Sequence, residues 1–216
     1  MTARELLSET WRQVTTRQGL GQGLGAARGQ AVLDELIAAY LQPARRYHTL
    51  DHIAALLRQL EEHKDGVIDY DAVALAILFH DVVYDPRRQD NEAQSAAVAR
   101  QRLTSLGFPA AGVDKVAAYI EATQHGHEVA IADPDLALFL DLDLSTLAAA
   151  PEAYRLYASA IRREYAHVPD ALYHLGRRQI LDGFLARERI YRTERLSSLW
   201  EARARANMSE EIAGLR

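Results

Sequence analysis

The sequence predicts an all-α protein, a helical bundle with about nine or ten helices in a single domain over residues 1–216. Its apolar residues recur with a helical period, and we find no convincing strand-like alternation. All six prolines lie at or near the ends of the periodic segments, where a missing amide donor costs little. The chain is long enough to bury a full core, and its 49% hydrophobic and 25% charged residues exclude a wholly disordered protein.

The N-terminal part, residues 1–45, is predicted to contain helices over residues 3–17 and 29–41. The glycine-rich stretch 19–29 separates them and indicates a flexible loop.

The central part, residues 46–148, is expected to form the core of a metal site, with helices over 46–63, 70–83, 90–105, 110–123 and 134–148. The apolar run 72–79 could be a buried strand by hydrophobicity alone. It is rich in alanine and leucine, however, and it follows Asp69 and Asp71, which suit the start of a helix. We therefore predict that it is the central buried helix.

The C-terminal part, residues 149–216, is predicted to contain helices over 151–165, 170–187 and 193–213. The last of these alternates charges with apolar residues on one side. Such a helix packs on its own domain or against a second copy of the chain, so a homodimer stays open.

Composition narrows the classes of function. A formal net charge of −5 provides no overall basic field for phosphate backbones, so we expect a small ligand and no dedicated nucleic-acid binding. Without cysteine, any metal must be held by His, Asp or Glu. No apolar run approaches the roughly 18 residues of a membrane span, and the first residues are unlike a signal peptide, so we expect a cytoplasmic protein without membrane association.

Two histidines, His48 and His52, are four residues apart in the segment RYHTLDHI. On a helix they share one face, which Leu56 and Leu60 continue, so the histidine face is also the core face. A single core histidine is usually a satisfied structural residue, whereas two in register leave a structural and a functional interpretation about equally open.

His80 and Asp81 follow the apolar run 72–79. An imidazole and a carboxylate at the end of a buried helix are costly unless a partner compensates them, and a cation is a natural partner. The alternative is a hydrogen bond between Asp81 and His80 that closes the helix.

Two aspartates, Asp141 and Asp143, lie in the apolar segment FLDLDLS. On a helix they point about 200° apart, so one is expected to face a site and the other to be a surface or capping residue. His125 and His127 flank a glycine that suits a helix end, and loop histidines of this kind are commonly exposed.

Taken together, these elements resemble the HD-domain superfamily of metal-dependent phosphohydrolases. The superfamily pattern is a histidine at a helix start, a His-Asp pair at the end of a buried helix and a distant aspartate before a leucine. More narrowly, RYHTLDHI, FHDVVYD, DNEAQSA, FLDLDLSTL, IRREY and ARARANMSEEI are similar to segments of bacterial proteins described only as predicted HD-superfamily hydrolases. The resemblance spans roughly residue 45 to the C-terminus, and several elements in order are a far stronger signal than the His-Asp pair alone.

The resemblance implies that a divalent metal ion is held by His48, His80, Asp81 and Asp143. It favours His48 over His52 and Asp143 over Asp141. Two imidazoles and two carboxylates suit Mn, Fe, Co, Ni, Zn or Mg without choosing among them.

The implied function is hydrolysis of a small phosphorylated substrate, with nucleotides among the candidates, by attack of a metal-bound water. Asp81 and Glu92 are the implied catalytic residues, with Glu92 orienting the water. The residues expected to contact the substrate or to support the metal ligands are His52, Asn91, His125, His127, Asp141, Arg162, Tyr165 and Arg177.

The main alternative is a helical metal-containing protein that binds a nucleotide, or regulates in response to one, without cleaving it. The residues alone allow it, because metal ligands indicate a metal and not turnover. A ferritin-like site would need two Glu-x-x-His motifs, and only Glu164–His167 fits. A zincin and a serine hydrolase both lack their motifs here.

Overall fold

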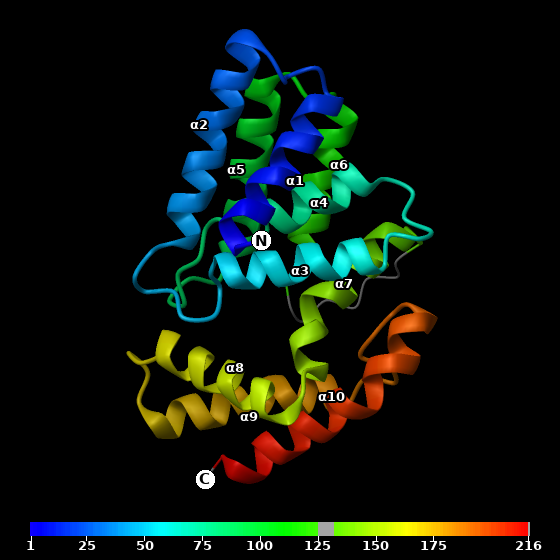
Figure 1. The fold of residues 1–216 in the computed structure, drawn as a ribbon. Helices are drawn as coiled ribbons and strands as arrows, with labels where there is room; N and C mark the ends of the chain where they lie inside the picture. The colour runs from blue at the N-terminus through cyan, green and yellow to red at the C-terminus, as the bar shows by residue number, and fades with distance from the viewer. Residues whose placement is uncertain (125–131, 216) are drawn as a thin grey trace. The chain divides into compact units, whose positions relative to one another are not determined.

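The computed structural model describes residues 1–124 and 132–215. Over these ranges the chain forms ten α-helices and one short 3₁₀ helix, with no β-strand (Figure 1), which confirms the predicted all-α class. The elements are α1 (Ala3–Arg17), α2 (Gly23–Tyr40), α3 (Leu50–Glu62), α4 (Tyr70–Phe79), α5 (Asn91–Leu106), α6 (Ala110–Glu121), α7 (Pro134–Asp143), η1 (Leu144–Ala148), α8 (Pro151–Glu164), α9 (Asp170–Leu185) and α10 (Glu194–Gly214). None of the helices in the described ranges combines the length and apolar character that a bilayer crossing requires.

The chain divides into two compact units, Met1–Phe139 and Leu140–Arg216. The division falls inside α7, which continues as one helix through it. The single domain over residues 1–216 stays a prediction.

Helix α4 is the centre of the first unit. Every residue from 72 to 79 is buried, and α1, α3, α5 and α6 all pack against this helix, as the central-helix prediction required. The side chain of Asp69 accepts a hydrogen bond from the backbone N–H of Ala72 and caps the first turn. The helix ends at Phe79, four residues before the predicted end, so Asp81 lies beyond the helix.

The predicted glycine-rich loop at 19–29 is wrong beyond its first residues, because α2 begins at Gly23. A close backbone approach explains Gly25, whereas Gly19 and Gly23 have positive φ values of 75° and 58° that favour glycine. A Cβ on Gly25 would lie 3.3 Å from the Cα and carbonyl oxygen of Leu20, and the indole N–H of Trp11 donates to the carbonyl oxygen of Gly29 at 3.0 Å. Gly25 therefore lets α2 pack closely against the turn before it.

The predicted start of the third helix at residue 46 is also wrong. Thr49 is the N-cap and α3 begins at Leu50, so His48 precedes the helix and does not share a helical face with His52. Thr49 is a residue type that favours the N-cap, with Asp51 in the following turn, and this was the available sequence signal.

The second unit packs α8, α9 and η1 around α10. Its interior contains a buried ion pair in which the Arg177 guanidinium donates to the Glu211 carboxylate at 2.7 Å. The amide of Asn207 donates to the carbonyl oxygens of Leu147 and Ala149 at 2.8 and 2.9 Å and so fastens α10 to the turn around η1.

Candidate metal centre

His80 follows the last residue of α4 and is 2% exposed. Its Nδ1 lies 2.9 Å from the carbonyl oxygen of Ile77. Because a carbonyl oxygen can only accept, Nδ1 carries the proton and donates it. In the neutral imidazole, Nε2 therefore carries a lone pair, which is the form that binds metals.

The lone-pair nitrogen of His80 faces two other electron-rich atoms. Nε2 lies 3.0 Å from Oδ2 of Asp81 and 3.4 Å from Nε2 of the buried His52, which α3 contributes in its first turn. The His52 nitrogen is in turn 3.7 Å from Oδ2 of Asp81. Two imidazole nitrogens and a carboxylate oxygen thus converge on one point, where either a proton on Nε2 of His52 or a bound metal cation would satisfy the His80 lone pair.

Electrostatics keep Asp81 in its ionised form. Burial alone would raise the pKa of this carboxyl, but the nearby imidazoles of His80, His48 and His52, in their protonated forms, outweigh burial and hold the pKa of Asp81 well below its usual range. An ionised carboxylate is the form that binds a divalent cation.

Helix α7 carries Asp143 as its last residue. Its first turns are fixed within the first unit, because Asp135 accepts hydrogen bonds from the backbone N–H groups of Ile68 and Asp69 at 2.9 and 2.7 Å. One turn before Asp143, the ring of Phe139 lies 5.9 Å from the ring of His80. Residues four apart share a helical face, so the same face of α7 presents both side chains.

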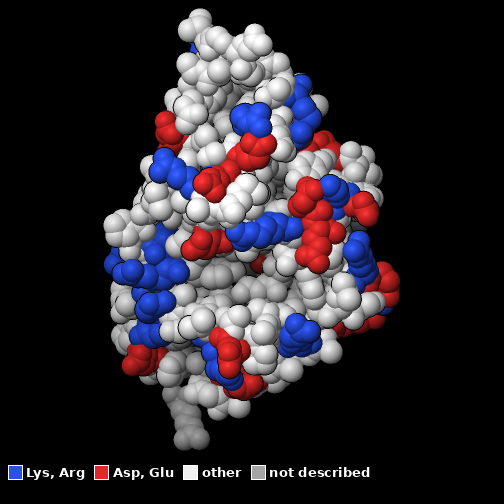
Figure 2. Space-filling view, viewed as in Figure 1, with Lys and Arg blue, Asp and Glu red and all other residues white. Residues whose placement is uncertain are grey.

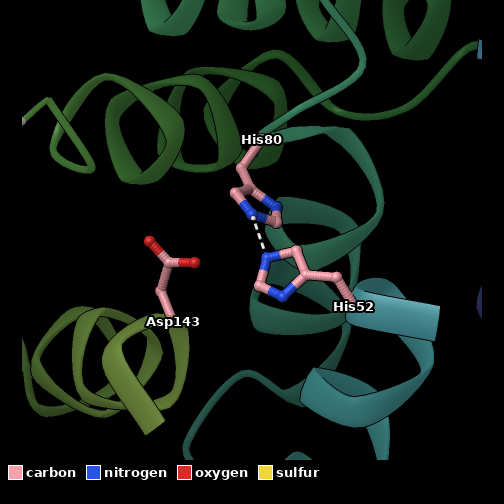
Figure 3. Close-up of side chains that lie close together, drawn as sticks. All are labelled: His52, His80 and Asp143. Atoms are coloured by element: carbon pink, nitrogen blue, oxygen red, sulfur yellow. Dashed lines mark hydrogen bonds between the residues drawn. The ribbon is translucent and has the colours of Figure 1, made fainter. Parts of the chain in front are cut away.

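His52, His80 and Asp143 form a group that could hold a metal ion. One ligand atom from each lies within 4.8 Å of the other two. Figure 3 shows the two imidazoles and the carboxylate directed toward one another from three separate helical segments. The predicted metal cofactor is supported to this extent, while the identity of the metal stays a prediction.

The group contains His80 and Asp143 of the predicted ligand set together with His52, which was expected to support the ligands, and it does not include the predicted ligands His48 and Asp81. The ring of His48 is stacked on Tyr84, with 4.1 Å between centroids and 29° between planes, and its centroid is 5.9 Å from that of His52. His48 thus borders the group. The stacking partner Tyr84 was missed in the sequence, since nothing in a turn after the His-Asp pair distinguishes a functional tyrosine.

Asp141 has a different role from Asp143. It is fully buried, and its carboxylate accepts three hydrogen bonds of 2.7 Å, from the backbone N–H groups of Arg192 and Thr193 and from the Thr193 hydroxyl. Burial raises the pKa of Asp141 despite these donors. Asp141 is therefore the capping residue of the pair and holds the segment that leads into α10.

Two of the predicted site residues, Asn91 and Glu92, are the first two residues of α5. The amide of Asn91 is paired with Asp85: its oxygen accepts from the Asp85 N–H at 3.1 Å and its nitrogen donates to the Asp85 carbonyl at 2.9 Å. Asn91 thereby shapes the turn after the His-Asp pair. Glu92 lies in the first turn of α5, and within the described ranges its side chain makes no hydrogen bond or ion pair.

The predicted residues of the second unit serve its own packing. Arg162 donates to the carbonyl oxygens of Tyr165 and Val168 at 2.6 and 3.0 Å and to the carboxylate of Asp170, so it closes the C-terminal end of α8. Tyr165 is the C-cap of that helix, and Arg177 is held in the buried ion pair described above. His125 and His127 lie outside the described residues.

No protein-family model matches the chain, and neither a curated protein nor a solved structure matches it. The function must therefore be argued from the side chains themselves. On the face drawn in Figure 2, Lys and Arg side chains occur together with Asp and Glu side chains.

Proposed function

We propose that this protein is a metal-dependent phosphohydrolase that acts on a small phosphorylated substrate, with nucleotides among the candidates. One observation carries the proposal. The tautomer that Ile77 imposes on His80 aims an imidazole lone pair at the Asp81 carboxylate and at His52, within a buried cluster. The resemblance of the His-Asp pair and its neighbouring segments to HD-superfamily hydrolases supports the same proposal.

The donor set fits a divalent cation. His52, His80, Asp81 and Asp143 offer two imidazole nitrogens and carboxylate oxygens, which suit Mn, Fe, Co, Ni, Zn or Mg. When bound, such a cation lowers the pKa of a coordinated water towards about 7 and polarises a phosphoryl oxygen. We place His52 ahead of His48 as the first histidine ligand.

The protein itself contributes position and proton transfer. The carbonyl of Ile77 holds the proton of His80 on Nδ1 and so keeps Nε2 directed at the group. The residue that we propose to give a proton to the leaving oxygen of the substrate is His48, whose ring stacks on Tyr84 beside the group.

The test is a metal analysis coupled to an activity screen. Purified full-length protein is analysed for bound metal and then assayed against nucleotides, phosphomonoesters and cyclic nucleotides. We expect bound divalent metal and turnover of at least one class in the wild type, and loss of both in Asp81→Asn. Asp51→Asn is the matched control, because Asp51 is an exposed carboxylate one residue from His52, and it should behave as the wild type.

The outcomes separate the competing interpretations. Metal in the wild type, its loss in Asp81→Asn and no hydrolysis by either protein across the panel would favour a metal-containing binding or regulatory protein. Absence of metal from wild-type protein prepared without chelators would refute both interpretations.

A further inference from the structure

Arg45 is a buried residue next to the candidate metal centre, with 4% of its surface exposed. Its guanidinium nitrogen Nη1 donates to the carbonyl oxygens of Asp81 at 2.6 Å and of His48 at 3.2 Å. The second nitrogen, Nη2, donates to the carbonyl oxygen of Val82 at 2.9 Å. A single planar group therefore joins the backbone of the His-Asp segment to the backbone that leads into α3 and His52.

The carbonyl groups that Arg45 binds need a donor from outside. Helix α4 ends at Phe79, so Asp81 and Val82 lie beyond its last turn, where carbonyl oxygens lack helical partners. A guanidinium provides several N–H donors in one rigid plane, and a cation is favoured near the C-terminal end of a helix. Arg45 supplies both the N–H donors for these carbonyl oxygens and the positive charge at the end of α4.

The segment that follows α4 is also held by hydrogen bonds from two other side chains. Ser95 of α5 accepts from the Val83 N–H at 3.1 Å and donates to the Val83 carbonyl at 3.2 Å, and Asn91 pairs in the same two-way manner with Asp85. Arg45 is the member of this set that also reaches the His48 backbone, so it alone among these three side chains connects the two histidine-bearing segments.

The rings of two tyrosines flank the guanidinium. Its Cζ lies 5.1 Å from the ring centre of Tyr40 and 5.6 Å from that of Tyr84, within cation–π range. Tyr84 in turn stacks on His48. Movement of the guanidinium would therefore disturb the His48 ring in addition to the backbone carbonyls.

We propose that Arg45 is a positioning residue for the metal centre. Its guanidinium holds the Asp81 backbone at a fixed distance from the segment before α3, and this distance brings Asp81, His80 and His52 together. Burial and its three carbonyl partners keep Arg45 from binding phosphate itself. The inference rests on the metal-binding part of the proposed function and is independent of hydrolysis.

The test compares Co²⁺ binding to full-length Arg45→Ala, Arg45→Lys and wild type, by titration calorimetry and by the visible absorption of the bound ion. Loss of a group that supports metal ligands typically weakens metal binding about 10–100-fold. We expect a loss of that size in Arg45→Ala, with a changed Co²⁺ spectrum. Arg45→Lys should be intermediate, since an ammonium keeps the charge but cannot form the planar fork. Millimolar guanidinium ion should restore part of the affinity of Arg45→Ala.

Tyr40→Phe is the matched control. It removes a buried hydrogen bond from the Tyr40 hydroxyl to the Leu78 carbonyl of α4, 3.0 Å long, but it leaves the guanidinium and its flanking ring in place. This variant should melt at a lower temperature and bind Co²⁺ as the wild type does.

The proposal is overturned if Arg45→Ala, or Arg45→Lys should the alanine variant fail to fold, binds Co²⁺ with wild-type affinity and spectrum. A loss of affinity in Tyr40→Phe equal to that in the arginine variants also overturns it, because general destabilisation would then explain the effect. A wild-type protein that binds no Co²⁺ is a separate result that refutes the proposed function and removes the basis of this inference.

Discussion

Replacing Asp141 with alanine should destabilise the protein without a direct effect on metal ligation. The carboxylate accepts three hydrogen bonds of 2.7 Å while fully buried. A hydrogen bond to a charged group contributes about 1.5–3 kcal/mol. The cost of burying the carboxylate offsets part of the combined stabilisation from the three hydrogen bonds, and the raised pKa of Asp141 reflects this cost. A net loss of about 3–5 kcal/mol is expected, in the range for breaking a buried polar pair.

Thermal denaturation of the metal-free protein, followed by circular dichroism, measures this effect. For a chain of this size each kcal/mol shifts Tm by about 2–4 °C, so Asp141→Ala should lower Tm by roughly 6–20 °C. Asp141→Asn should also destabilise, because its NH₂ group would face backbone N–H donors that need an acceptor.

Asp143→Ala is the matched comparison, two residues along the same chain segment. It should change the Tm of the metal-free protein much less and weaken Co²⁺ binding at least tenfold, since Asp143 belongs to the candidate ligand group. The reverse pattern, with metal lost in Asp141→Ala and stability lost in Asp143→Ala, would refute the division of roles between the two aspartates.

Three further predictions follow from the site and its supports. His52→Ala should bind Co²⁺ at least about tenfold more weakly than His48→Ala, and equal losses in calorimetry would contradict the choice of His52 as ligand. Because the pKa of Asp81 is held low, acid release of the metal should follow protonation of the histidine ligands, so Co²⁺ affinity should fall before the carboxyl is protonated. A fall only near about pH 4, where a free aspartate titrates, would contradict this. Asp135→Ala should lower stability by about 2–4 kcal/mol in denaturant unfolding, because it leaves the N–H groups of residues 68–69 without their acceptor, and an unchanged midpoint would show that this anchor is dispensable.

The character of α4 could be predicted from the sequence because it depends on local pattern. Residues 72–79 are apolar on every side and rich in alanine and leucine, which is typical of a helix that other helices surround. The placement of His80 at the end of this run follows directly, and so does the expectation that a buried imidazole and its neighbouring carboxylate need compensation.

The boundaries that went wrong depend on contacts that the local pattern does not contain. The glycines of residues 23–29 suggest a loop when only propensity is considered, yet the indole of Trp11 donates to Gly29 from the preceding helix. The start of α3 decides whether His48 and His52 share a face, and one misplaced turn reverses the conclusion.

Sequence alone determined that this protein is helical, that His80 and Asp81 follow its central buried run, and that one of Asp141 and Asp143 had to face away from any site. The tertiary structure decided which aspartate it was, because the donors that claim Asp141 lie about fifty residues further along the chain. It also decided the role of Arg45, whose burial under the His-Asp segment has no local signature. Periodicity reports which face of a helix is apolar, whereas hydrogen-bond partners are set by segments that meet only when the chain has folded.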